Sequence, residues 1–140
     1  MKILALSEAN ILSFHSMALI AAAGEGGISA QKISELTNCS RNHLFKVLEN
    51  LVRANLVYST RGPLGGYHLK RPAKDIVLVE VFEALNGKVD EENICVGRNR
   101  HEESFIFFQQ LCQELTARYL TYLKSTKISD LEPKARFLLK

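Results

Sequence analysis

Apolar residues recur at helical spacing over the first third of the chain and predict three helices. Ser7 is the expected cap of the first helix, and Gly24 is its expected end. The apolar positions of this helix are Ile11, Leu12, Phe14, Ala18, Leu19 and Ala22. Ser29 and Ser40 are the expected caps of two further helices, which are separated by a turn at residues 37–39.

The third of these helices is expected to bury one face and expose the other. The apolar face carries Leu44, Val47, Leu48 and Leu51, which are spaced i, i+3, i+4 and i+7. The polar face carries Arg41, Asn42, Lys46, Glu49, Asn50 and Arg53. Two helices joined by a short turn, with polar and basic groups on the second helix, predict a helix-turn-helix unit.

A β-hairpin is expected directly after this unit. Residues 56–60 and 67–69 have the composition of short strands, and the glycine-rich residues 62–66 between them favour a turn. We interpret residues 56–69 as a wing that follows the helix-turn-helix. After Pro72, the apolar pattern of residues 76–85 predicts a fourth helix.

The remainder of the chain contains a charged segment and a long amphipathic helix. Residues 88–103 are charged and have no apolar period, so we expect an exposed loop. In the helix predicted over residues 104–126, the apolar positions are Phe105, Phe108, Cys112, Leu115, Tyr119 and Tyr122. Their spacing of 3, 4, 3, 4 and 3 is typical of a seam between two packed helices, and the chain has no second long helix to cover it. The seam therefore predicts a homodimer.

The predicted fold class is mainly α with a small β-hairpin. It comprises a winged helix-turn-helix domain over residues 1–87, a charged loop over residues 88–103 and a dimerisation helix over residues 104–126. Residues 127–140 are expected to form a C-terminal tail, to which the sequence assigns no role.

Composition narrows the possible classes of protein. With 140 residues and 46% apolar side chains, the chain fits one globular domain, which excludes global disorder and most large enzyme folds. The three cysteines are an odd number, which argues against a disulfide scaffold and favours a reducing compartment. No export signal or membrane span is evident, so we expect a cytoplasmic protein. The four histidines match no catalytic motif, and an enzyme is not expected.

Charge is unevenly distributed along the chain. The net charge is only +3, but residues 29–74 contain eight Lys and Arg against two Glu. A compact basic stretch in a nearly neutral protein favours a surface that binds a polyanion.

The wing carries the most specific motif. Residues Arg61-Gly62-Pro63-Leu64-Gly65-Gly66-Tyr67 resemble the R-G-x-x-G-G-Y wing signature of the IscR, NsrR and CymR family of bacterial winged-helix regulators. The match is supported by Ser40 with Leu44, Leu56-Val57, Leu85-Asn86-Gly87 and Ile128-Ser129-Asp130-Leu131. The resemblance covers nearly the whole chain and implies a homodimeric transcription factor, expected to be a repressor, that binds a palindromic double-stranded DNA operator.

Candidate DNA contacts come from the recognition helix and the wing. A recognition helix presents its first turns to the major groove, which selects Ser40, Arg41, Asn42, His43 and Lys46. In the wing, the candidates are Arg61, Gly62, Pro63, Leu64, Gly65, Gly66 and Tyr67. Among these, Arg61 has the character of a minor-groove probe.

Cys95 is the candidate sensor residue. It lies in the charged loop near Arg98 and Arg100, and such cations favour the thiolate. The resemblance implies an iron-sulfur cluster held by three cysteines of this loop, but the sequence retains only Cys95. His101 stands where the second cysteine is expected, and Glu8 lies where some members contribute a carboxylate, so a cluster or metal with mixed ligands is one hypothesis.

Two interpretations of the signal remain open at this point. In the first, a redox or metal signal at Cys95 switches DNA binding. In the second, the protein is a cluster-free regulator controlled by a partner protein or a small molecule. Cys39 is interpreted as a packing residue in the turn of the helix-turn-helix, and Cys112 as a packing residue in the dimer seam.

Overall fold

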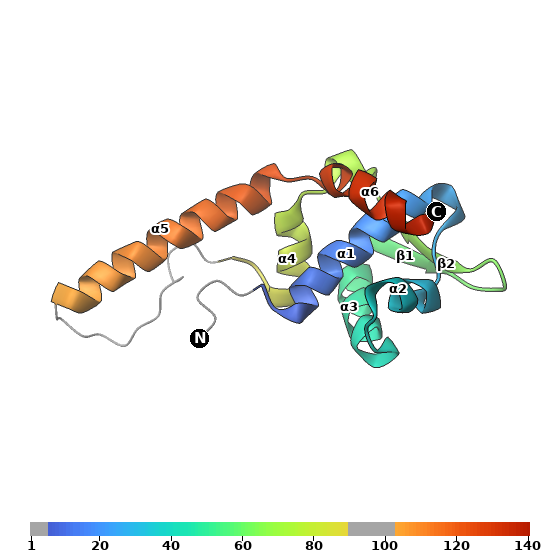
Figure 1. The fold of residues 1–140 in the computed structure, drawn as a ribbon, viewed down its shortest axis with the longest axis horizontal. Coiled ribbons are helices and arrows are strands. Elements are labelled where there is room, and N and C mark those ends of the chain that lie inside the picture. Colours follow the sequence, from blue (N-terminus) through green and yellow to red (C-terminus); the bar gives the residue numbers. More distant parts are fainter. Residues whose placement is uncertain (1–5, 90–102) are drawn as a thin grey trace.

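The computed structural model describes residues 6–89 and 103–140 (Figure 1). The helices are α1 (Glu8–Ala23), α2 (Ala30–Thr37), α3 (Arg41–Arg53), α4 (Leu78–Asn86), α5 (Glu103–Ser125) and α6 (Ile128–Arg136). The strands are β1 (Val57–Thr60) and β2 (Gly66–Leu69). The mainly α fold with a small β-hairpin is therefore confirmed.

Serine caps define the starts of the first three helices. Ser7 Oγ accepts a hydrogen bond from the backbone N–H of Asn10 at 3.2 Å. Ser29 and Ser40 do the same for the N–H groups three residues further on, at 3.1 and 3.2 Å. Each bond satisfies a backbone donor that has no partner within the helix, so the three predicted helix starts are confirmed.

The core is built around α1 and the apolar face of α3. All four stripe residues of α3 are buried, namely Leu44, Val47, Leu48 and Leu51. In α1, Met17, Leu19 and Ile20 are almost fully buried, whereas Ile11 is 54% exposed. Ile11, one of the apolar positions of the sequence pattern, therefore lies largely outside the core. Helix α1 is apolar on several faces, and its periodicity does not single out the face that contacts the core.

The wing is an antiparallel hairpin held against the segment that precedes α2. Val57 pairs with Leu69, and Thr60 pairs with Gly66. Ile28 extends this ladder, since its N–H donates to the carbonyl of Tyr67 at 3.2 Å and its carbonyl accepts from the Tyr67 N–H at 2.8 Å. The predicted hairpin is confirmed, and the isolated bridge between Ile28 and Tyr67 ties it to the domain.

Helix α4 begins two residues later than predicted. Ile76 is extended, at φ −112° and ψ 120°, and its carbonyl accepts a hydrogen bond of 2.9 Å from the N–H of Ile128. The Glu80 carboxylate accepts from the Val77 N–H at 3.0 Å and caps the new start. A long-range backbone pair therefore replaces the first turn of the predicted helix.

The C-terminal residues, which the sequence suggests are a tail, are folded. They form α6 and a final short turn at residues 137–139, and α6 packs along α1 (Figure 1). Ile128 and Ala135 are buried. Pro133 and the mixed charge of this stretch conceal the apolar positions in the sequence.

Helix α5 confirms the predicted long helix. Its 23 residues correspond to about 35 Å, and in Figure 1 its N-terminal half projects away from the other helices. Most of the predicted charged loop lies outside the described residues. Across residues 6–89 and 103–140, no helix is long and apolar enough to span a membrane.

Candidate nucleic-acid interface

The polar residues predicted on the recognition helix lie together at its N-terminal end. Ser40, Arg41, Asn42 and Lys46 are exposed, and His43 is half-buried. Ser40 serves two purposes here, because its hydroxyl caps α3 while remaining accessible. The first two turns of α3 therefore present a cation, an amide and a second cation to solvent.

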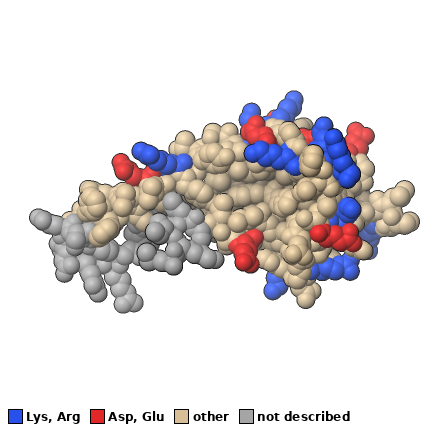
Figure 2. Space-filling view, viewed as in Figure 1, with Lys and Arg blue, Asp and Glu red and all other residues tan. Residues whose placement is uncertain are grey.

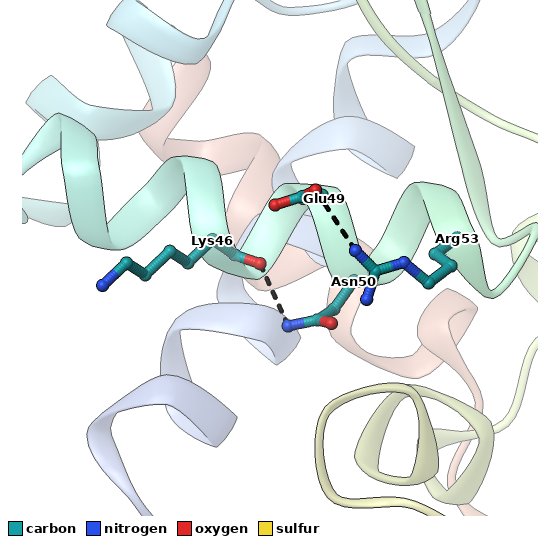
Figure 3. A network of polar contacts seen from close by, with 4 residues as sticks. All are labelled: Lys46, Glu49, Asn50 and Arg53. Atoms are coloured by element: carbon teal, nitrogen blue, oxygen red, sulfur yellow. Dashed lines mark hydrogen bonds and ion pairs between the residues drawn. The ribbon is translucent and has the colours of Figure 1, made fainter.

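Two basic side chains of this region are already neutralised by ion pairs within the protein. Arg53 pairs with Glu49 at 3.2 Å, and Arg71 pairs with Glu80 at 2.6 Å. Figure 3 shows the Lys46 side chain extending toward the N-terminal end of α3, away from the Glu49–Arg53 pair. Asn50 Nδ2 donates to the backbone carbonyl of Lys46 at 3.0 Å and leaves the ammonium group untouched.

Three of the four Lys and Arg side chains on α3 and the wing remain available for an anion. Within the part of the chain that the structure describes, no carboxylate forms an ion pair with Arg41, Lys46 or Arg61. In Figure 2, Lys and Arg side chains gather toward the edges of the visible face, and its middle is largely uncharged.

Close backbone approaches set the shape of the wing. A Cβ on Gly65 would lie 2.5 Å from the carbonyl oxygen of Thr60, and a Cβ on Gly66 would lie 2.8 Å from backbone atoms of Ile28. Gly62 adopts φ +105°, which side chains rarely tolerate. The glycines of the motif are thus required by the fold of the hairpin itself.

The other residues of the wing motif divide into exposed and packed positions. Arg61, Pro63 and Leu64 are exposed at the turn, and Leu64 is 91% accessible. Tyr67 packs against the core, and burial raises the pKa of its hydroxyl. Gly66 is buried beside Ile28. Tyr67 and Gly66 therefore lie where they hold the wing in place rather than at its outer surface.

Sequence reasoning missed Phe45. This side chain lies on α3 between Asn42 and Lys46 and is 47% exposed. Its position outside the stripe of Leu44, Val47 and Leu48 is visible in the sequence. The signal is therefore an aromatic residue on the polar face of an otherwise well-patterned helix.

Of the proposed metal ligands, the structure describes only Glu8. It lies exposed in the first turn of α1, while Cys95 and His101 fall outside the described residues. Over the two described ranges, no three His, Cys, Asp or Glu side chains could jointly hold a metal ion. Cys39 is half-buried with its Sγ 3.0 Å from Thr37 Oγ1, as suits a packing residue.

The seam residues of α5 do not all have the same environment. Phe108, Cys112 and Tyr122 are exposed. Tyr119 instead packs edge-on against Phe82 of its own chain, with ring centroids 6.1 Å apart. Leu115 is half-buried, and the side chain of Phe105 is not described. The described seam residues thus leave side-chain surface open to solvent in both halves of α5, at Phe108 and at Tyr122, each 63% exposed.

Comparison with known proteins identifies the fold. The solved structure of CymR, the global cysteine regulator of B. subtilis, superposes with a TM-score of 0.78 at 26% identity, covering 94% of this chain and 98% of that one. The structure of T. potens IscR gives a TM-score of 0.74 at 25% identity, covering 94% of this chain and 88% of that one. The predicted winged-helix architecture is confirmed by these likenesses.

Sequence relatives agree with the structural ones. BadM of Rhodopseudomonas palustris is 31% identical over 129 residues, which cover 90% of this chain and 80% of the relative. The regulator IscR of Cereibacter sphaeroides is 30% identical over 118 residues, which cover 82% of this chain and 76% of the relative. These relatives are named as transcription regulators, a non-enzymatic class. The model of the Rrf2 family, described as an iron-dependent transcriptional regulator, matches residues 6–133, and the chain belongs to this family of DNA-binding winged-helix regulators.

Proposed function

We propose that this protein is a homodimeric repressor that binds a palindromic DNA operator through α3 and the wing. The observation that carries this proposal is the group of three unpaired cations, Arg41, Lys46 and Arg61, on the two elements that a winged helix presents to DNA. A bound dimer covering a promoter would repress by excluding the polymerase.

The two elements would contact different grooves. The first turns of α3 enter the major groove, where Arg41 and Lys46 reach guanine acceptors or phosphates and Asn42 suits adenine. Ser40, the cap of the helix, precedes these residues, and His43 lies between Asn42 and Lys46. Arg61, beside the exposed turn of the wing, would enter the adjacent minor groove.

Loss of either cation should weaken operator binding. Lys46→Ala and Arg61→Ala are assayed by fluorescence anisotropy over a salt series, on an operator selected from random DNA. Each lost phosphate contact should reduce the log-log salt slope by about one, whereas a lost base contact should cost about 1–3 kcal/mol and relax specificity.

Arg136→Ala is the matched control for these two variants. It removes the same charge from α6, where Arg136 pairs with Glu132. This variant should keep wild-type affinity and salt slope. Wild-type binding by both Lys46→Ala and Arg61→Ala would remove these residues from the interface.

We infer that two copies associate through α5. Its N-terminal half carries an apolar ridge of Phe107, Phe108 and Leu111, each more than 40% exposed. Figure 2 shows few charged side chains on the visible surface of this helix. At its C-terminal end, the same helix borders a groove of about 420 Å³ with an almost wholly apolar lining from α1, α4, α5 and α6. A second copy that covers both surfaces would bury them from water.

The sensed signal is proposed at Cys95, with Glu8 and His101 as the further ligands of a mixed site. In that case, anaerobically purified protein should contain iron and absorb between about 350 and 450 nm, as thiolate-ligated iron does. Cys95→Ser should lose the iron and make operator affinity insensitive to oxidants, while Cys112→Ser should change neither. Iron-free, colourless wild type would instead favour the cluster-free regulator controlled by a partner or effector.

A further inference from the structure

The recognition helix carries a large apolar side chain where polar groups are expected. Phe45 is 47% exposed and is absent from the set of residues that pack against the hydrophobic core. The core face of α3 is complete without it, because Leu44, Val47 and Leu48 are all at most 2% exposed. Phe45 is therefore not needed to hold α3 in place.

Phe45 lies among the side chains proposed to enter the major groove. Asn42 is three residues before it and Lys46 is next to it, so the three share one side of the first two turns. Residues three apart are neighbours on the surface of an α-helix, so Asn42 and Phe45 would enter the groove side by side. The two side chains can thus reach neighbouring base pairs.

We propose that Phe45 recognises the 5-methyl group of a thymine in the major groove, an inference that rests on the proposed function. Thymine is the base that presents a methyl group in that groove, and Phe is among the side chains that contact it. An aromatic face has no hydrogen bond to offer a base edge or phosphate, so its contribution to DNA recognition is apolar contact. Phe45 then sets a preference for thymine at a defined position of each half-site.

Removing the methyl group from the DNA tests this contact without altering the protein. Each thymine of an operator selected from random DNA is replaced in turn by deoxyuridine, which keeps the Watson-Crick pairing. At one thymine per half-site, wild-type affinity should fall about fourfold, the effect expected for one buried methyl-sized group. Indifference of wild-type binding to every such replacement would overturn the proposal.

Variants of Phe45 complete a double-mutant cycle. Phe45→Ala should bind the thymine operator more weakly and should no longer distinguish thymine from deoxyuridine at that position. Phe45→Leu, which keeps an apolar side chain, should retain part of the discrimination. The matched control is Val52→Ala, which shortens another exposed apolar side chain of α3, at 39% exposure, and should leave the discrimination intact.

The outcomes separate this inference from the proposed function. If Phe45→Ala still discriminates fully at the sensitive thymine, another residue contacts the methyl group and the proposal is wrong. If Phe45→Ala loses affinity to the same degree on every sequence, the side chain acts through protein structure, and the proposal is again wrong. If the wild-type protein selects no DNA sequence at all, the proposed function is itself wrong, and the role of Phe45 is wrong with it.

Discussion

Gly66 shows how one missing side chain sets the position of the wing. It occupies an ordinary backbone conformation, yet an added Cβ would meet the backbone of Ile28 at 2.8 Å. Since Ile28 is bonded to Tyr67 in both directions, the two backbones cannot separate without breaking that bridge. Gly66→Ala should therefore destabilise the fold by about 1–3 kcal/mol, as overpacking does, in urea denaturation monitored by circular dichroism.

Gly26 provides the opposite test in the same part of the molecule. Nothing lies within 4 Å of an added Cβ, and the backbone does not need a left-handed conformation there. Gly26→Ala should stabilise by about 0.4–1 kcal/mol, because alanine restricts the unfolded chain. Equal effects of the two substitutions would show that the close approach at Ile28 is not what makes Gly66 necessary.

At the residue scale, the sequence predicted which residues form the wing better than it predicted which of them are exposed to solvent. The R-G-x-x-G-G-Y motif located the wing, but only the structure shows that Gly66 and Tyr67 pack inward while Arg61 and Leu64 lie outside. Phe45 was missed because it lies outside the apolar stripe of α3 and is not one of the polar residues from which candidate DNA contacts were chosen. Which face of a helix meets a neighbour depends on tertiary contacts, and these are not encoded in local spacing.

Elements whose limits depend on local interactions were predicted accurately. The starts of α1, α2 and α3 follow from serine caps that bond within their own helix. The start of α4 was displaced because Ile76 bonds to Ile128, about fifty residues away in the chain. Helix α6 was missed for the same reason, since its packing partner is α1, at the other end of the sequence.

The packing of α6 predicts that it unfolds together with the rest of the core. Ile128 is fully buried, so Ile128→Ala should lower the free energy of unfolding by about 2–5 kcal/mol. Phe137→Ala is the control in the turn that follows α6, where the ring is 74% exposed, and it should change stability by less than about 0.5 kcal/mol. The measurement is urea denaturation. If both variants changed the free energy of unfolding by similarly small amounts, residues 127–140 would not be part of the cooperative core.

At the scale of the whole molecule, the sequence was most informative about the order of the elements along the chain and least informative about how two chains associate. The succession of helix-turn-helix, hairpin and long helix predicted the winged-helix architecture, because each unit is contiguous in the chain. The dimer remains a prediction, since its contacts lie between chains. What the structure adds is the distribution of exposed apolar surface, which concentrates on α5 and continues into the groove beside α1 and α6.

The dimer prediction is tested by placing charge on that surface. Phe108 is 63% exposed on the N-terminal half of α5, and Leu115 lies two turns further along the same seam. In Phe108→Glu/Leu115→Glu, two carboxylates from each subunit would face one another in the apolar interface, where desolvation and like charge oppose association. Light scattering at micromolar concentration should show monomers, and operator affinity should fall because each half-site is then bound alone.

The matched control places the same charge on the opposite side of the helix. Gln110 and Gln113 are described on α5 at positions roughly opposite Phe108, so Gln110→Glu/Gln113→Glu should stay dimeric and bind the operator normally. If both double variants became monomers, helix stability rather than the seam would be responsible. If the wild-type protein were monomeric at the same concentration, the prediction that α5 forms a dimer interface would be wrong. Helix α3 and the wing would then recognise a single half-site, without the two-fold symmetry that a palindromic operator requires.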